Sequence, residues 1–303
     1  MDNAQVMLVG SANMDLVVRT HRFPGPGETL QGLGFKTFTG GKGANQAAAA
    51  GKLGAKVGLI AKVGTDAFGD QLVDALAESG VDTSFILRET ECSTGVALIT
   101  VDDSGQNTIV VAPGANALLA PSDVQSGLDR VDFSVLLAQL EIPLETVVAA
   151  SNFAANRTFI LNPAPAKELA SDLLCHVDYL TPNETEAHIL TGILPVDEET
   201  CIASAATLLD RGVKNVLFTL GAKGSFLANS RGGHHFPSIE VNPVDTTGAG
   251  DAFNGAFAFF LAKGEPVERA ISLANIVGAL STTKLGAQAS MPSIEEVLKF
   301  DVW

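Results

Sequence analysis

The sequence predicts an α/β fold, with a doubly wound, mostly parallel central sheet flanked by helices and a small β-sheet lid subdomain. From about Asp66 onward, short β-branched runs alternate with segments of helical spacing. That order is typical of a parallel sheet covered by helices. The expected strands are apolar runs without alternation, as strands buried on both faces are. Two further stretches break the order and predict β-structure outside the main sheet.

The central sheet and its covering helices are predicted from successive segments of the chain. Its strands are expected at residues 6–9, 57–63, 135–140, 158–161, 177–180 and 216–220. Amphipathic helices are expected over 66–79 and 198–211, each followed by a glycine that can end it. The segments 252–263 and 270–282 are apolar on most sides, so we expect them to be buried helices.

The two exceptional stretches predict the lid. Residues 16–39 hold the turn signals of a PGPGE run and then an alternation of Leu33 and Phe35 with small or polar residues. Residues 96–101 and 108–112 flank a polar, glycine-containing segment, which is typical of a hairpin. The second domain is therefore discontinuous. We expect a lid of 16–39 and 93–112, and a large nucleotide- and substrate-binding domain of 1–15, 40–92 and 113–303.

Composition excludes several classes of protein. The 303 residues carry 34 acidic and 19 basic side chains, a formal charge of −15, which argues against nucleic-acid binding. With 46% hydrophobic and 17% charged residues, the chain can build a large core. The uncharged stretch 252–262 is shorter than the roughly 18 to 20 residues that a membrane span needs, so no membrane span is expected.

The cellular compartment of the protein is predicted from the first residues of the sequence and from its cysteines. Residues 2–5 carry no positive charge before an apolar block, so we expect no secretory signal. Cys92, Cys175 and Cys201 are widely spaced and form no CxxC pair, which disfavours a disulfide framework or a zinc site. We therefore expect a cytoplasmic protein whose cysteines are small core residues.

Polar residues follow several of the expected strands at their carboxyl ends, where ligands of open α/β sheets bind. They are residues 11–15, Glu141, Asn162 and 221–224. For any single one of them, a loop side chain that caps a neighbouring element is an equally good explanation. Their number is what predicts a site at this edge of the sheet.

The segment DTTGAGD, residues 245–251, precedes an expected buried helix. Gly248, Ala249 and Gly250 allow a tight turn whose N–H groups point at one spot. Because a helix start carries about half a positive charge, it would stabilise a phosphoryl group that builds up negative charge. Asp251 lies beside that spot and can accept a proton from an attacking hydroxyl. The alternative is an ordinary turn with Asp251 as the helix N-cap.

A second glycine-rich stretch, GGKGAN at residues 40–45, opens an Ala-rich segment. Its glycines allow close approach of a small polar ligand, and Lys42 and Asn45 supply hydrogen bonds; a solvated turn is the alternative. No Ser or Thr follows Gly-Lys as in a Walker A loop, and no GxGxxG follows the first strand. HExxH and GxSxG are also absent. The group NETE at 183–186 is either a capped first helical turn or a set that holds hydrated Mg²⁺ against phosphates.

Several motifs together resemble the carbohydrate kinases of the PfkB, or ribokinase-like, family. They are DTTGAGD, the GGKGANQAAAAGKLGA run, SANMD near the start and NETE in the middle, and the match runs from about Val6 to Ile294. GAGD is shared across sugar and nucleoside kinases, whereas STGVALI, NPAPA, TPNETEA and GAQAS carry the sugar assignment. The resemblance implies that the γ-phosphoryl group of ATP is transferred to the 5-hydroxyl of D-ribose, with Mg²⁺ and an activating monovalent cation, K⁺.

The resemblance also implies roles for single residues. Asp251 would be the base, and Gly248, Ala249 and Gly250 would form the anion hole. The sugar would be bound by Asn13, Asp15, Gly41, Lys42, Gly43, Asn45, Glu141 and Asp251. The nucleotide would be bound by Asn183, Glu186, Thr219, Gly221, Ala222, Lys223, Gly224, Gly250 and Asn275, with Glu186 acting through Mg²⁺. The cation would be bound, largely by backbone carbonyls, at Asp245, Thr247, Ser281, Lys284, Gly286 and Ser290, with the Lys284 side chain pointing away.

Further implications concern the lid and the charge. The resemblance suggests that the lid closes over the sugar, excluding water, and pairs with its twin in a homodimer. A chain of charge −15 that binds ATP needs a local positive field, which we expect from Mg²⁺, Lys223 and the helix start. Three alternatives remain. The first is a related kinase that acts on fructose, on a nucleoside or on a deoxy sugar acid. The others are a catalytically silent sugar-binding protein and an NAD-dependent enzyme.

Overall fold

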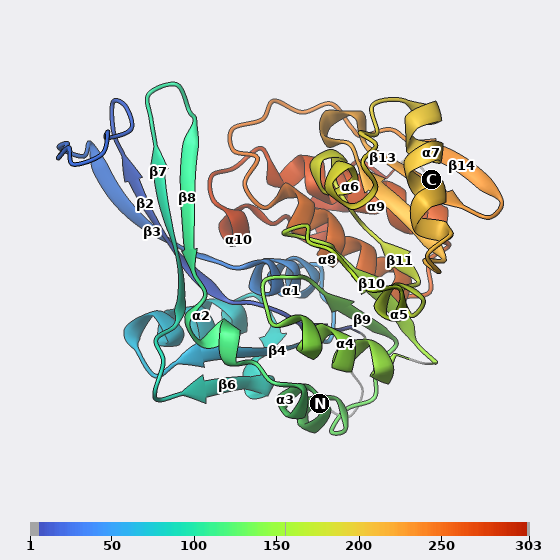
Figure 1. The fold of residues 1–303 in the computed structure, drawn as a ribbon, viewed down its shortest axis with the longest axis horizontal. Coiled ribbons are helices and arrows are strands. Elements are labelled where there is room, and N and C mark those ends of the chain that lie inside the picture. Colours follow the sequence, from blue (N-terminus) through green and yellow to red (C-terminus); the bar gives the residue numbers. More distant parts are fainter. Residues whose placement is uncertain (1–5, 155, 302–303) are drawn as a thin grey trace.

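The computed structural model describes residues 6–154 and 156–301, which form a layered body from which a small sheet projects (Figure 1). In the body, the strand order is β14-β13-β12-β11-β10-β9-β1-β4-β5, with β6 beside β4. All of these strands pair in parallel except β13 and β14, which are antiparallel. Their bounds are β1 Val6–Val9, β4 Val57–Gly64, β5 Val81–Asp82, β6 Ile86–Glu89, β9 Val135–Ala138, β10 Thr158–Leu161, β11 Tyr179–Leu180, β12 Asn215–Thr219, β13 Ser225–Asn229 and β14 Gly232–Phe236.

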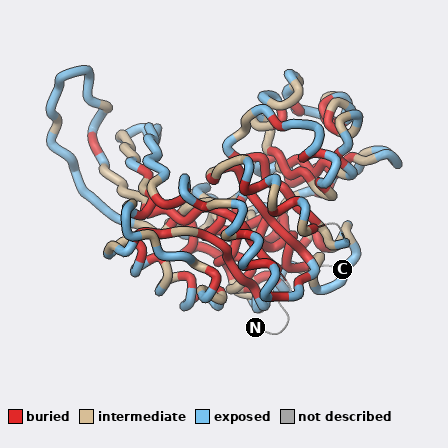
Figure 2. Tube along the Cα trace, turned by 60° about the horizontal axis from the view of Figure 1, so that its bottom comes forward, coloured by how far each residue is buried: buried red, intermediate tan, exposed pale blue. Residues whose placement is uncertain are grey.

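Helices cover both faces of this sheet, because alternate strand residues point to opposite sides. In β1, Val6 and Leu8 join one buried cluster, while Met7 and Val9 join the other. The first cluster lies under α1 Lys42–Lys52, α2 Ala67–Glu78, α8 Ala249–Ala262, α9 Val267–Ser281 and α11 Ile294–Leu298. The second lies under α3 Pro121–Leu128, α4 Leu144–Phe153, α5 Ser171–Leu174, α6 Glu184–Thr191 and α7 Glu198–Leu209. Buried residues are concentrated in this body (Figure 2).

The projecting sheet has the strand order β3-β2-β7-β8. Its strands are β2 Asn13–Arg19, β3 Gly34–Gly40, β7 Gly95–Val101 and β8 Asn107–Ala112. The pairs β2–β3 and β7–β8 are antiparallel, and β2–β7 is parallel. Every residue of β8 is exposed. We call this sheet the lid sheet. The division of the chain into a lid and a large domain at the predicted boundaries stays a prediction.

The remaining short elements connect these layers. They are the 3₁₀ turns η1 Thr83–Phe85, η2 Gly114–Leu118 and η3 Gly221–Lys223, and the short helix α10 Ala287–Ser290. The turn η2 carries the chain from the end of β8 back to the body.

The predicted fold class is confirmed, with three local differences. Helix α8 begins at Ala249 and not at residue 252, with Gly248 as its N-cap, so the alternative that made Asp251 the N-cap is wrong. Cys201 is buried, Cys92 is half-buried and Cys175 is exposed, so of the three cysteines expected in the core only Cys201 lies there. The strand expected at 177–180 is only Tyr179–Leu180. None of the helices in the described part of the chain is long and apolar enough to cross a bilayer.

Candidate active site

The candidate site lies beyond the carboxyl ends of parallel strands, the edge at which open α/β sheets bind ligands. Two adjoining cavities, with volumes of about 900 Å³ and about 160 Å³, open beside residues that end or follow β10, β11 and β12. Five residues line both cavities: Asn183, Thr219, Thr246, Ala249 and Gly250. Because the last two begin α8, the N-terminus of this helix lies at the junction of the cavities.

The two glycines at the start of α8 stand in different surroundings. Gly248 has φ 76°, in the left-handed region, and a Cβ there would meet the Ala287 Cβ at 2.9 Å. A Cβ on Gly250 would meet nothing within 4 Å, because that position faces open space at the cavity wall. The N–H of Ala249 donates to the Thr246 carbonyl at 3.2 Å, within the turn itself. The helix N-terminus thus presents a bare backbone to the smaller cavity and favours an anion there.

Asp251 lies in the first turn of α8 and is only 7% exposed. Its Oδ2 accepts a hydrogen bond from Asn45 Nδ2 at 2.9 Å, and its Oδ1 accepts one from Gln46 Nε2, also at 2.9 Å. Both donors come from α1. For the predicted sugar contact, Asn45 keeps the second hydrogen of its Nδ2 and its Oδ1, which is buried without a protein partner among the described residues.

Lys42 places a cation beside this anion-binding turn. It lines the smaller cavity together with Gly250, Asp251 and Glu186. Burial alone would lower the pKa of Lys42, but Asp251, Glu141 and Glu186 raise it above its usual value, so the ammonium stays charged. The sequence prediction assigned Lys42 to the sugar; the cavity places it equally close to where a phosphate would sit.

Several residues predicted to bind the sugar interact with one another near Asp251. Burial, with Glu141 and Asp251 nearby, raises the pKa of Asp15 from 3.8 to about 7. Glu141 Oε2 accepts hydrogen bonds from Ser11 Oγ at 2.5 Å and from the Lys42 backbone N–H at 3.1 Å. These are mostly acceptor groups, and they suit the several hydroxyl donors of a polyol.

Two glycines let α1 approach β1 and β2 closely. Gly41 has φ 88°, and a Cβ there would lie 2.6 Å from the Asn13 backbone nitrogen. A Cβ on Gly43 would lie 2.7 Å from the backbone of Gly10. Any side chain at either position would push the α1 residues that face the site away from it.

Asn116 is a site residue that the sequence prediction missed. Its Oδ1 accepts from the Ala12 N–H at 2.9 Å, and its Nδ2 donates to the Ala12 carbonyl at 3.1 Å and to Asn13 Oδ1 at 2.7 Å. Because the backbone N–H can only donate, the orientation of the Asn116 amide is fixed, and Asn13 must turn its own Nδ2 the other way. Asn116 follows β8 whereas Asn13 begins β2, so no local motif connects them.

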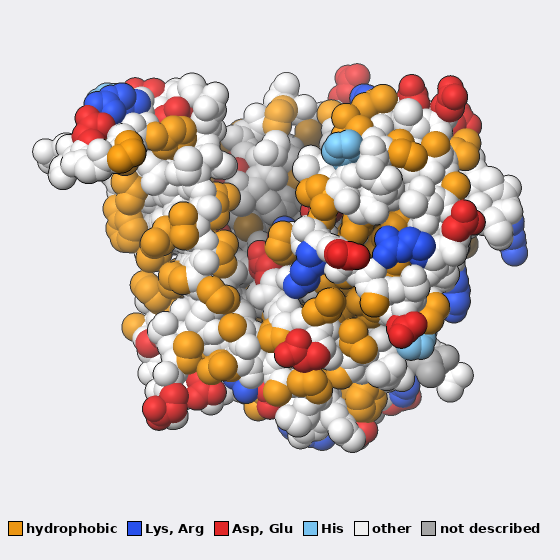
Figure 3. All heavy atoms as spheres, in the orientation of Figure 1, with side chains coloured by type: hydrophobic (Ala, Val, Ile, Leu, Met, Phe, Trp, Pro, Cys, Tyr) orange, Lys and Arg blue, Asp and Glu red, His pale blue; other side chains and the backbone are white. Residues whose placement is uncertain are grey.

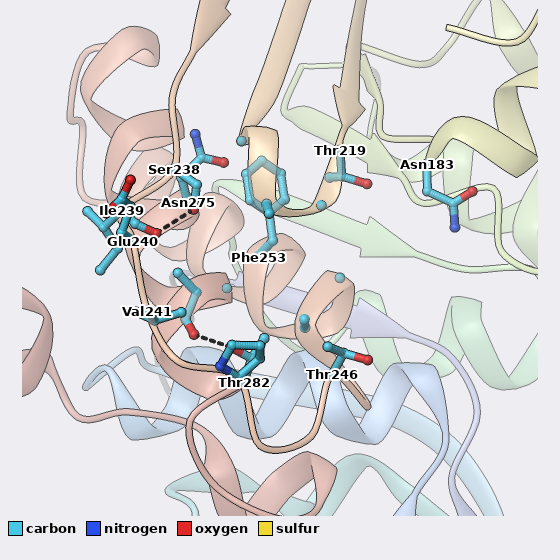
Figure 4. Close-up of a pocket in the computed structure, with 18 of the residues that line it drawn as sticks. Asn183, Thr219, Ser238, Ile239, Glu240, Val241, Thr246, Phe253, Asn275 and Thr282 are labelled. Carbon is cyan, nitrogen blue, oxygen red and sulfur yellow. Dashed lines mark hydrogen bonds between the residues drawn. The ribbon is translucent and has the colours of Figure 1, made fainter. Parts of the chain in front are cut away.

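The larger cavity collects most of the residues predicted to bind the nucleotide (Figure 4). Its walls include Asn183, Thr219, Gly221, Ala222, Gly224, Gly250 and Asn275. Figure 4 also shows Ile239 and Val241 opposite Thr219 and Asn183; the segment 238–243 after β14 carries no motif, and the sequence prediction missed it. Asn275 Nδ2 donates to the Phe236 carbonyl at 3.0 Å.

Lys223 differs from the prediction. It lines neither cavity, and its Nζ donates to the Val196 carbonyl at 3.2 Å. In this structure, the positive charge nearest the smaller cavity is therefore supplied by Lys42 and the start of α8, not by Lys223.

The NETE segment begins α6 with the predicted cap. Asn183 Oδ1 accepts from the Glu186 N–H at 2.8 Å, and Glu186 Oε2 accepts from the Asn183 N–H at 2.9 Å. Glu186 nevertheless also lines the smaller cavity. Burial raises its pKa, partly offset by the bond to Asn183 and by the charge of Lys42. The capped turn thus places the half-buried Glu186 carboxylate at the cavity wall, and its role in holding hydrated Mg²⁺ stays a prediction.

The loops predicted to bind a monovalent cation come together beside α8. The N–H groups of Val244 and Asp245 both donate to the Thr282 carbonyl, and Asp245 Oδ2 accepts from the Gly286 N–H at 2.9 Å. Lys284 pairs with Glu296 at 2.8 Å, so its ammonium is already engaged on the surface. Ser281 and Ser290 donate to carbonyls of their own turns. In the described ranges no cluster of His, Cys, Asp and Glu side chains could hold a metal ion, so an ion here would rest on backbone oxygens.

Comparisons with known proteins agree with this geometry. The sequence model of the family described as pfkB family carbohydrate kinase matches residues 3–294. A ribokinase of Haemophilus influenzae is 42% identical over 97% of this chain and 97% of its own, and a deoxyribokinase of Salmonella typhi is 41% identical over 96% of each. The crystal structure of a ribokinase from Thermotoga maritima has a TM-score of 0.90 at 39% identity, covering 98% of this chain and 99% of that one. Arabidopsis thaliana ribokinase complexed with ribose and ATP has a TM-score of 0.91 at 33% identity, covering 98% of both chains.

Proposed function

Because this chain belongs to the pfkB family of carbohydrate kinases, we propose that it is a ribokinase, which phosphorylates D-ribose at the 5-hydroxyl with ATP. The observation that carries the proposal is the junction of the two cavities, where the α8 N-terminus, Lys42 and Asp251 meet. ATP would occupy the larger cavity, with its γ-phosphate against the start of α8. The sugar would lie among Asn13, Asp15 and Glu141.

In the reaction, the ribose O5 forms a bond to the γ-phosphorus while the bond from that phosphorus to the β,γ-bridging oxygen breaks, and ADP leaves. The O5 proton passes to the carboxylate of Asp251. Backbone N–H groups at the start of α8 and the ammonium of Lys42 stabilise the charge on the moving phosphoryl group. The N–H groups and the Asp251 carboxylate are held before the substrates arrive, the former by the helix and the latter by the bonds from α1.

Two ions fit the residues present. The half-buried Glu186, with a raised pKa at the wall of the smaller cavity, would hold hydrated Mg²⁺, which neutralises phosphate charge when bound. Backbone carbonyls in the two loops that contain Asp245 and Gly286 would hold K⁺, which would steady the turn before α8 from outside.

We also place the homodimer interface on the lid sheet. Exposed apolar side chains of Phe35, Leu98 and Val110 share one face of this sheet, opposite to the face that carries Asp15. Hydrophobic side chains gather over this part of the molecule in Figure 3. An apolar surface of this kind is typical of a protein–protein contact. Sedimentation of the protein should give the mass of two chains.

The deoxyribokinase among the relatives makes 2-deoxy-D-ribose the second candidate substrate. The proposal is tested by ATP turnover with D-ribose, 2-deoxy-D-ribose, D-fructose and a panel of nucleosides. We expect the highest kcat/KM with D-ribose. A nucleoside preferred over both pentoses, or no sugar-dependent turnover at all, would refute the proposal.

A further inference from the structure

Gln46 connects the carboxylate of Asp251 to a buried chain of amide side chains. We propose that Gln46 is a positioning residue, which fixes the orientation of the Asp251 carboxylate for proton transfer without touching the substrate. The inference rests on the proposed function, because it takes Asp251 as the base.

The geometry uses both hydrogens of one amide. Gln46 Nε2 donates to Asp251 Oδ1 at 2.9 Å and to Asn162 Oδ1 at 3.0 Å. Gln46 Oε1 accepts from Gln139 Nε2 at 2.6 Å. Gln46 and Gln139 are completely buried, and Asn162 is 6% exposed. One side chain on α1 thereby ties α8 to the ends of β9 and β10.

The orientation of this chain is set by the backbone. Asn162 Nδ2 donates to the Thr181 carbonyl at 3.0 Å, and a carbonyl can only accept. Asn162 must therefore turn its Oδ1 toward Gln46, and the NH₂ group of Gln46 must donate the hydrogen bond between them. Since neither amide can rotate by half a turn without losing a bond, Oδ1 of Asp251 always meets a donor.

The second oxygen of Asp251 is held from the same helix. Asn45, next to Gln46 in α1, donates to Oδ2. With one donor on each oxygen, the plane of the carboxylate is fixed and its charge is stabilised, while lone pairs remain for the sugar hydroxyl. A base within reach of a proton must first be oriented correctly, and these bonds supply the orientation.

A purely structural role accounts poorly for this chain. Gln139 Oε1 is buried and lacks a hydrogen-bond partner among the described residues, a state that is costly in a protein interior. The backbone is also adapted to it, because a Cβ on Gly10 would come within 2.1 Å of this oxygen. Well-packed apolar side chains of the same volume would fill the space without an unpaired group.

The test compares the variants Gln46→Met and Gln46→Glu with Thr146→Val as a matched control. Met keeps the length of Gln but cannot donate to Asp251. Glu keeps the shape, removes the donor and puts a second carboxylate beside Asp251. Thr146 is completely buried on α4, and its hydroxyl donates to the Leu119 carbonyl in the other core. Replacing this hydroxyl by a methyl group therefore tests the effect of lost stability alone.

For Gln46→Met we expect kcat to fall about 10- to 100-fold, with the KM values for ribose and ATP within about threefold of the unmodified enzyme. For Gln46→Glu we expect the acid limb of the kcat/KM profile to move to higher pH, because two adjacent carboxylates hold a proton more tightly than one. The charged groups that interact with Asp251, namely Asp15, Lys42 and Glu186, are the same in every variant. Thr146→Val should leave kcat and its pH profile unchanged.

The inference is overturned if Gln46→Met retains the kcat and pH profile of the unmodified enzyme, or if its loss of activity disappears once the unfolded fraction is subtracted. Should Gln46→Met not fold, Gln139→Met serves instead, because it leaves Gln46 in place and removes only the bond to its Oε1. A smaller fall in kcat at unchanged KM then supports the inference, and an unchanged kcat overturns it. Asp251→Asn separates the two proposals: if that variant stays active, the proposed mechanism itself is wrong.

Discussion

Replacing Asp15 by Asn should stabilise the sugar-free protein at alkaline pH and lower its affinity for the sugar. Burial, followed by the charges of Glu141 and Asp251, raises the pKa of Asp15 from 3.8 to about 7. The folded state therefore binds a proton at Asp15 that the unfolded chain releases at a lower pH. This contribution is fully present below about pH 4 and is lost as the pH rises through 7.

The magnitude follows from the size of the shift. A difference of about 3 pKa units, at 1.36 kcal/mol per unit, corresponds to about 4 kcal/mol at full ionisation. Asn resembles the protonated acid and carries no charge. The free energy of unfolding of Asp15→Asn should therefore exceed that of the unmodified protein by up to about 4 kcal/mol at pH 8, and by almost nothing at pH 4.

Urea unfolding of the sugar-free protein at pH 4, 6 and 8 measures this difference directly. Sugar must be absent, because a ligand that binds only the folded state adds its own stabilisation. Asp74→Asn, on the exposed face of α2, is the matched control and should show no such pH dependence. A gain that is the same at pH 4 and pH 8, or no gain at pH 8, would refute the reasoning.

Four further predictions concern the reaction. Asp251→Asn should keep the fold and ribose binding by calorimetry but lower kcat by several orders of magnitude; near-normal turnover would contradict its role as the base. Lys42→Met should lower kcat about 100- to 1000-fold and raise the KM for ATP, whereas a kcat within threefold would place its charge outside the reaction. Asn116→Asp keeps the acceptor for the Ala12 N–H but removes the donor to Asn13, so the KM for ribose should rise about tenfold at unchanged KM for ATP; equal changes in both would point to a general distortion. Replacing K⁺ by Na⁺ or Cs⁺ should lower the rate, and indifference to the ion would remove the proposed cation site.

The fold could be predicted because its signals are local. The strands at residues 6–9 and 158–161 are continuous apolar runs, and burial on both faces is what such runs encode. The start of α8 was misplaced because the glycines on either side of Ala249 disfavour a helix. Gly248 is the left-handed N-cap, whereas Gly250 lies inside the first helical turn, and glycine composition alone does not distinguish these two positions.

The site was predictable only where one segment carries the chemistry. Asp251 and the glycines beside it stand in a single motif, whereas Asn116 acts on a residue 103 positions away. Gln46 lies in an Ala-rich run, where the pattern predicts a polar residue on the solvent-facing side of a helix and gives no sign of a buried contact. Its function depends on Asn162 and Gln139, which reach it from the ends of two strands, and such convergence exists only in the folded chain.

The charge distribution explains how a chain of net charge −15 can bind a polyanion. Beyond the Debye length of about 8 Å at physiological salt, surface charges are screened. The charged groups that line the cavity therefore determine whether the polyanion binds. With Lys223 turned toward Val196, Lys42 and the α8 N-terminus remain as the fixed positive field. That field also faces three carboxylates, those of Asp251, Glu141 and Glu186, so acidic groups outnumber the one lysine at the site. We therefore expect the triphosphate to enter together with Mg²⁺, which offsets the charge of its phosphates, so that the protein needs no excess of basic residues.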